Sequence, residues 1–301
     1  MTAGYLRSVG DSRTPLMAMV VSTVTNIGLD LLLVAVLRWG VAGAAIATVI
    51  AQGLSCMVCV VGVARQEALR FSAADMRPDA RMVRRLLSLG LPIAMQDCII
   101  SVGGLVLQTV VNGFGFIFLA GYSATSRLQG LLEIAGTSLG AGCGTFAGQN
   151  LGAGKLDRVR LGLRRSAQLG VVMALIIAGL LVLFGQPLLS LFIEDDDPQI
   201  VSQVLTYALR MLYVNCSALF ALYLLFVYRS TLQGLGDTVI PMISGFVELA
   251  MRVMSALLLP RLIGEWGVYT AEIAAWIGAA ALLIFGYYYR MRRLSAKEAT
   301  L

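Results

Sequence analysis

The 301-residue sequence predicts an all-α membrane protein with eight transmembrane helices, from its composition, its long apolar runs and an internal repeat. Hydrophobic residues make up 58% of the chain and charged residues 13%, and the mean hydropathy is +0.82. Soluble domains carry about 45–50% apolar and about 25% charged residues. One water-surrounded core cannot bury this much apolar surface, so we expect the excess to face lipid. The composition argues against a soluble enzyme, a disordered protein and a secreted disulfide scaffold.

Eight apolar runs are long enough to cross a bilayer, for which a helix needs about 20 mainly apolar residues. None alternates with a period of two, which favours helices over a barrel. The runs cover residues 15–37, 41–63, 90–112, 117–147, 167–191, 200–227, 240–262 and 268–289.

The charges between the runs predict the orientation of the chain. Most of the 23 Lys and Arg residues lie on one side of the membrane: before the first run, after the eighth, or between runs two and three, four and five, and six and seven. We place Arg229 between runs six and seven. The opposite side carries only Arg38, Arg261 and the acidic cluster 194–197. By the positive-inside rule, both termini are cytoplasmic. The net charge of +6 is therefore a topology signal, and we expect no nucleic-acid partner.

A motif of four residues occurs twice, in the same order and at the same spacing. Leu6, Gly10, Asp11 and Pro15 recur 226 positions later as Leu232, Gly236, Asp237 and Pro241. One span further on, Trp39-Gly40-Val41 recurs as Trp266-Gly267-Val268. An even number of spans separates the copies, so both have the same orientation. Such a parallel repeat is typical of transporters built from two halves.

The repeat predicts the domain organisation. The later copy closes a block of six runs, whereas the earlier copy is only the last two runs of its block, so we expect four further spans before Met1 and no coupled export by this chain alone. The predicted parts are residues 1–63, the last two helices of an N-terminal half; 64–89, a cytoplasmic linker; 90–290, a complete six-helix C-terminal half; and 291–301, a cytoplasmic tail.

Several segments together carry a family resemblance. They are residues 7–15, 26–30, 40–48, 90–92 with 108–115, 147–154 and 245–252. With these segments the chain resembles the multidrug and toxic-compound extrusion (MATE) family, whose members have twelve helices in two six-helix halves. The resemblance implies that this chain supplies helices five to twelve. Some members carry a glutamate in helix seven where this chain has Ile99 or Ile100, with Asp97 slightly earlier.

The resemblance also implies an activity. It is export of bulky, often cationic or amphipathic small molecules across the bacterial inner membrane, in exchange for H⁺ or Na⁺ and without a cofactor. The oligomeric state is left open. An exporter or flippase for a lipid-linked or metabolite substrate is an alternative, which a more basic cavity lining would favour, and a fragment that does not transport is another.

Enzymatic chemistry and metal binding are not expected. The chain has no histidine, so the G-x-S-x-G match at residues 136–140 has no imidazole base. The Cys56/Cys59 pair has no second cysteine pair to complete a zinc set.

Ionisable residues within the runs each need a reason, because they cost about 2.5–3.5 kcal/mol on insertion scales. Glu248 and Arg252 are four residues apart on one helical face, and we expect them to pair, either as a structural contact or for ion coupling. Asp97 has no partner within its own helix. We therefore predict that Asp97, ahead of Glu248, exchanges the coupling proton; a bond to a neighbouring helix or to interfacial water is the alternative.

Four other ionisable residues are weaker candidates. Asp30 either faces the cavity of the first half or forms a structural pair. Glu133 follows Arg127 by six positions, so its partner must come from elsewhere. Arg210 needs a carboxylate or carbonyl from another span. Glu272 lies near a helix end and is expected to reach water.

A stripe of glycines at four-residue spacing runs along the fourth span. Its members are Gly136, Gly140, Gly144, Gly148 and Gly152. We expect this stripe to let a neighbouring helix approach closely.

Overall fold

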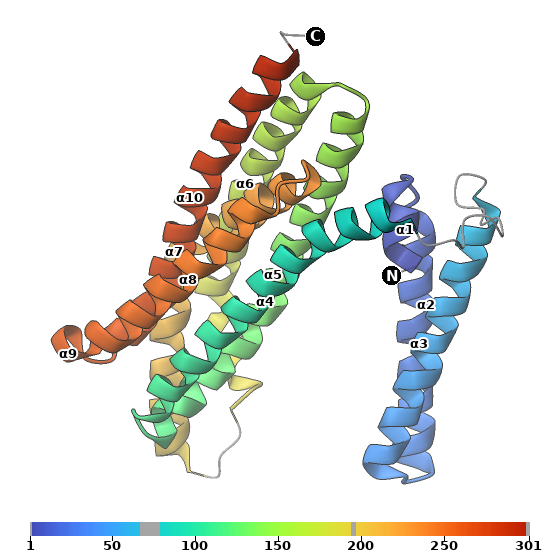
Figure 1. Ribbon diagram of the computed structural model, residues 1–301. Helices are drawn as coiled ribbons and strands as arrows, with labels where there is room; N and C mark the ends of the chain where they lie inside the picture. Colours follow the sequence, from blue (N-terminus) through green and yellow to red (C-terminus); the bar gives the residue numbers. More distant parts are fainter. Residues whose placement is uncertain (1, 67–78, 194–196, 299–301) are drawn as a thin grey trace. The chain divides into compact units, whose positions relative to one another are not determined.

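The computed structural model describes residues 2–66, 79–193 and 197–298, which form helices joined by short turns (Figure 1). The chain divides into two compact units, Met1–Ala80 and Arg81–Leu301. The boundary falls inside the predicted linker 64–89. Some of the predicted loop charges lie outside the described residues, namely Arg70, Arg77, Glu194, Asp195 and Asp196.

The first unit is a helical hairpin preceded by a short helix. Its elements are α1 (Thr2–Ser8), α2 (Arg13–Asp30), the π-helical segment η1 (Leu31–Val36) and α3 (Gly40–Arg65). Leu6, Ala18 and Cys59 form its small core. Most of the large apolar side chains on α2 and α3 are exposed in this unit, as expected of helices that face lipid or other protein.

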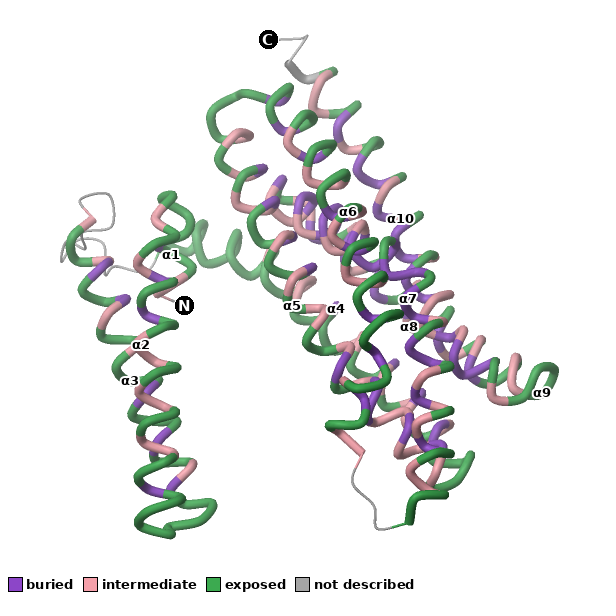
Figure 2. The backbone as a smooth tube through the Cα atoms, turned by 180° about the vertical axis from the view of Figure 1, so that it is seen from behind, coloured by how far each residue is buried: buried purple, intermediate pink, exposed green. Residues whose placement is uncertain are grey.

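The second unit is a bundle of long helices. Its elements are α4 (Ala80–Asn112), α5 (Phe116–Gly152), α6 (Leu156–Ser190), α7 (Pro198–Gly234), α8 (Val239–Leu258), the short α9 (Pro260–Ile263) and α10 (Trp266–Glu298). Helix α7 is at the centre and contacts α5, α6 and α10 along much of its length. The buried residues of the bundle concentrate on α7 and on the faces turned toward it (Figure 2).

Glycines make the close contact between α5 and α7. A Cβ at Gly140 would lie 2.9 Å from the carbonyl oxygen of Phe226, and one at Gly144 would lie 2.8 Å from that of Ser230. A Cβ at Gly148 would lie 3.3 Å from the carbonyl oxygen of Gly234, and one at Gly136 would lie 2.9 Å from the ring of Phe226. Gly152 does not belong to this contact, because a Cβ there would meet nothing within 4 Å. The stripe therefore ends before the last turn of α5.

The helices coincide with the predicted runs but extend beyond them. Seven of the described helical segments are long and apolar enough to cross a membrane. Helix α5, the predicted fourth span, is long enough but is outside that set; it carries Arg127, Glu133 and several further polar residues. Helix α4 begins at Ala80, within the predicted linker, and α10 continues to Glu298, within the predicted tail.

Candidate functional site: a buried ion-pair network

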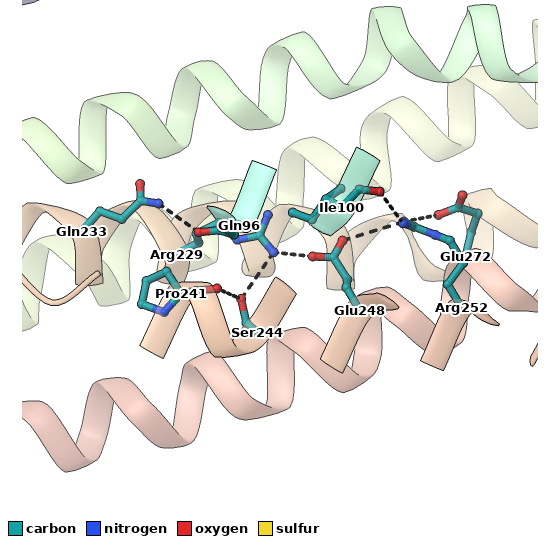
Figure 3. A network of polar contacts seen from close by, with 9 residues as sticks. All are labelled: Gln96, Ile100, Arg229, Gln233, Pro241, Ser244, Glu248, Arg252 and Glu272. Atoms are coloured by element: carbon teal, nitrogen blue, oxygen red, sulfur yellow. Dashed lines mark hydrogen bonds and ion pairs between the residues drawn. The ribbon is translucent and has the colours of Figure 1, made fainter. Parts of the chain in front are cut away.

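Two arginines and two glutamates form a chain of ion pairs in the interior of the second unit (Figure 3). Arg229 on α7 donates from Nη2 to Oε2 of Glu248 on α8 at 2.5 Å. The other oxygen of Glu248 lies 3.8 Å from Nη2 of Arg252, one turn further along α8. Arg252 in turn donates to Oε2 of Glu272 on α10 at 2.9 Å. The network therefore joins three helices.

Helix α8 positions the network because Ser244, Glu248 and Arg252 recur every four residues on its buried face. The Ser244 hydroxyl donates to the carbonyl of Pro241 at 2.6 Å and lies 3.5 Å from Nη2 of Arg229. These contacts hold the polar side of α8 against α7.

Helix α4 covers the network and adds uncharged contacts. The carbonyl of Ile100 accepts from Nη1 of Arg252 at 3.5 Å, and Gln96 accepts from Gln233 at 3.4 Å. Gly103 leaves the space that Arg252 occupies, since a Cβ there would lie 3.0 Å from its Nη1. The guanidinium of Arg252 is thus enclosed by α4, α8 and α10.

The four charges cancel, and little water reaches them. The side chains of Glu248 and Arg252 are 5% and 6% exposed. Removing charges from water costs several kcal/mol per ion, which only well-placed opposite charges offset. The Nε atoms of Arg229 and Arg252 are buried without a hydrogen-bond partner among the described residues. The network is therefore charge-balanced but not fully hydrogen-bonded.

A second polar cluster lies between α5 and α7. Gln129 donates to Glu133 at 3.1 Å, and Asn215 donates to Gln129 at 2.8 Å. Glu133 interacts electrostatically with Arg252 and with both glutamates of the network. The structure shows no ion pair of Glu133 with a basic residue among those it describes. Glu133 is thus a carboxyl beside the network whose charge the network does not balance.

The structure places the other sequence-predicted residues differently. Asp97, on α4, is exposed within the second unit, and its side chain has no hydrogen bond or ion pair among the described residues. Arg210 obtains its carboxylate from Glu265, just before α10, at 2.7 Å. Glu133 accepts from Gln129 on its own helix, and the basic residue that it interacts with electrostatically, Arg252, lies on α8.

Two expectations about charged residues are corrected. Glu272 does not reach for water, because it pairs with Arg252 and is 14% exposed. Arg229 does not lie in a loop, because α7 continues to Gly234 and buries it. The repeat relates Arg229 to Ala3, 226 positions earlier, and Ala3 lies in helix α1. By this correspondence, the helix before the second turn should continue past residue 227 and include Arg229. Sequence reasoning therefore missed one of the two arginines.

Asp30 lies in the first unit, at the end of α2. Its Oδ1 atom and the Nδ2 atom of Asn26, one turn earlier, are buried without a hydrogen-bond partner among the described residues. Unsatisfied buried polar atoms cost about 1–3 kcal/mol each, so this pair needs an explanation.

Comparisons with known proteins agree with this architecture. The family described as MatE matches residues 92–258, more than half of the chain. The "Probable multidrug resistance protein YoeA" of Bacillus subtilis is 28% identical over 302 residues, covering 94% of this chain and 62% of the relative. A "FAD transporter" of Shewanella oneidensis is 30% identical over 212 residues, covering 68% of this chain and 46% of the relative.

The fold is also that of a solved structure. A MOP superfamily transporter from Pyrococcus furiosus superimposes with a TM-score of 0.90 at 20% identity, covering 98% of this chain and 66% of that chain. The chain spans about 60% of the length of several of the curated relatives that it matches. The apolar helices show a multi-pass membrane protein. With the family match across α4–α8 and this fold, the chain belongs to the MATE family.

Proposed function

We propose that the protein exports small cationic or amphipathic molecules across the bacterial inner membrane, in exchange for H⁺ or Na⁺, with both termini cytoplasmic. Membership of the MATE family and relatives named as multidrug resistance proteins support this proposal. The observation that carries it is the excess of acidic groups in the interior of the second unit. Three glutamates, Glu133, Glu248 and Glu272, share this interior with two arginines, Arg229 and Arg252.

The unbalanced carboxyl provides a means of exchange. Because the network is neutral by itself, Glu133 is the group at which a proton, a sodium ion or a cationic substrate restores neutrality. Only one of these cations is needed at a time. If each cation favours a different conformation, binding of one drives release of the other. Gln129, which itself accepts from Asn215, donates to the Glu133 side chain and holds it in place for this role.

An anionic metabolite is the second candidate substrate, because one relative is named "FAD transporter". Recognition of an anion would need an arginine or lysine free to bind it. Both interior arginines already contact glutamates. The charges of the second unit therefore favour a cationic substrate.

The test is Glu133→Gln in the whole gene product, reconstituted in proteoliposomes with an imposed pH or sodium gradient and a fluorescent cationic dye. We expect gradient-driven export to fall by at least tenfold, with the unfolding midpoint in detergent unchanged. Glu265→Gln is the matched control, because it removes a carboxyl that pairs with Arg210 at the end of the bundle, outside the network. Normal ion-driven export by Glu133→Gln would refute the assignment.

Asp97 stays the alternative coupling carboxyl. Asp97→Asn in the same assay separates the two assignments. Loss of export in Asp97→Asn alone would move the coupling site to α4, and loss in neither variant would exclude both carboxyls.

A further inference from the structure

A groove of about 930 Å³ opens between α6, α7 and α10, away from the ion-pair network. One end carries Arg160 and Arg164 on α6 together with Tyr287 and Tyr288 on α10. The rest of the groove is mainly apolar, with Val172 and Leu224 among its lining residues. The groove thus has a basic, aromatic head and an apolar body.

The head of the groove lies at the end of the bundle where α6 begins and α10 ends. Arg160 donates to the Ser295 hydroxyl, which joins these two helix ends. In Figure 1, the turn between α5 and α6 lies at the same end of the second unit as the C-terminus. Lys155, Arg158 and Arg290 are further basic residues near these helix ends. A positive potential is therefore expected around the head.

The dimensions of the groove match one leaflet of a bilayer. From Arg160 to Val172, α6 advances twelve residues, or about 18 Å at the helical rise. Half of the hydrocarbon core of a bilayer is about 15 Å thick. A molecule with its polar group between the arginines would place an apolar tail along Val172 and Leu224.

The head contains donors that the protein leaves unused. The hydroxyl of Tyr287, a residue 3% exposed, is buried without a hydrogen-bond partner among the described residues. It interacts electrostatically with Arg160. Arg164 is exposed and has no partner among the described residues. Arg160 has two other contacts, the Ser295 hydroxyl and the carboxylate of Asp157. The side chain of Asp157 is 95% exposed, and such surface pairs contribute little.

We propose that this groove binds an anionic phospholipid of the bilayer, with the phosphate between Arg160, Arg164 and Tyr287 and an acyl chain along α6 and α7. Arginine and tyrosine donate to phosphate oxygens, and basic pockets between transmembrane helices accept anionic lipid headgroups. A free phosphate would use the head of the groove but not its apolar body. The site is independent of the exchange step proposed for Glu133.

The experiment is native mass spectrometry of the purified, delipidated full chain in detergent, with added phosphatidylglycerol, phosphatidylcholine or glycerol 3-phosphate. We expect retention of one phosphatidylglycerol in preference to the other two. Arg164→Gln should weaken this binding roughly fivefold, the effect of one basic residue near anionic lipid. Arg165→Gln is the matched control, because it removes a neighbouring exposed arginine that does not line the groove.

Tyr287→Phe separates the groove from general surface charge, because it removes one hydroxyl and leaves every charge in place. We expect it to weaken phosphatidylglycerol binding severalfold. Equal retention of phosphatidylcholine, equal binding of glycerol 3-phosphate, or an equal loss in Arg165→Gln would each overturn the proposal.

Discussion

At the start of α2 and at the start of α8, the backbone makes the same turn. Gly10 and Gly236 both have a positive φ, of 90° and 73°. The amide of Asp11 donates to the carbonyl of Leu6 at 2.9 Å, and that of Asp237 donates to the carbonyl of Leu232 at 3.0 Å. Each preceding helix ends in this six-residue closure, which requires a residue in the left-handed region.

Beyond these turns, the first helix pair, α2 and α3, differs from the second, α8 and α10. At the repeat spacing of 226 and then 227 positions, Glu248, Arg252 and Glu272 correspond to Ser22, Asn26 and Ala45. The network thus has no charged counterpart in the first pair, although the turns agree. The repeated residues are those that a turn between two helices needs. The charged residues are not needed to form a helix pair, so they have a role particular to the second half.

The largest effect should come from breaking the network. Glu248→Gln removes the charge that both Arg229 and Arg252 contact. We expect the free energy of unfolding to fall by about 3–5 kcal/mol, because buried arginines are left without a full counter-charge. Thermal unfolding in detergent, followed by circular dichroism, measures this loss.

The matched control for Glu248→Gln is Ser22→Ala, at the corresponding position of the first pair. It should change stability by less than about 1 kcal/mol, because Ser22 contacts no charged group in the part of the chain that the structure describes. A similar loss in the two variants would mean that the network is not particular to the second pair.

Sequence patterns predicted part of this site, for identifiable reasons. The spacing of Glu248 and Arg252 within one helix predicted their contact, since residues four apart share a face. Arg229 and Glu272 come from other helices, 19 and 20 positions from their partners. No periodicity within a helix reports such contacts, which depend on how α7 and α10 pack against α8.

The helices themselves were more predictable than their ends. Apolar runs of sufficient length located each long helix, because the bilayer requires that length. The polar turns of α4 before residue 90 and of α7 after residue 227 extend beyond those runs. Charged helical ends are not distinguished from loops by hydropathy, and for this reason Arg229 was misplaced.

An intermediate effect is expected at the two glycines of the repeated turn. Gly10→Ala and Gly236→Ala each force a side chain into the left-handed region, at a cost of roughly 1–2 kcal/mol. Because the two turns have the same geometry, the two losses of stability should be equal within error. Gly142→Ala is the control: it lies in α5, a Cβ there meets nothing within 4 Å, and it should be neutral or slightly stabilising. A clear cost at only one turn would break the equivalence.

The smallest effect should separate the two turns by acid sensitivity. The Asp11 carboxylate accepts from the Thr14 hydroxyl at 2.7 Å and from the amides of Thr14 and Arg13 at 3.0 Å. These bonds, the Thr14 hydroxyl first, hold the pKa of Asp11 below its usual value of 3.8. Because the folded-state pKa is lowered, the contribution of Asp11 to stability is present above pH 4 and is lost as the pH falls through the folded pKa. The second turn has Ile240 where the first has Thr14, and so lacks this hydroxyl.

Asp11→Asn should therefore lower the unfolding midpoint at pH 7, where the contribution of the Asp11 carboxylate is present, and change it little below the folded pKa, so that the pH profile becomes flatter. Thr14→Val is the matched variant, because it removes the hydroxyl that is the largest cause of the shift and leaves the carboxyl and both amide bonds. It should give an intermediate pH profile between those of the unmodified chain and Asp11→Asn. Thermal unfolding at pH 7, 5 and 3 in the same detergent measures all three profiles. If Thr14→Val had the same unfolding midpoint as the unmodified chain at every pH, the Thr14 hydroxyl would not distinguish the first turn from the second. The difference between the two helix pairs would then be confined to the ion-pair network of the second pair.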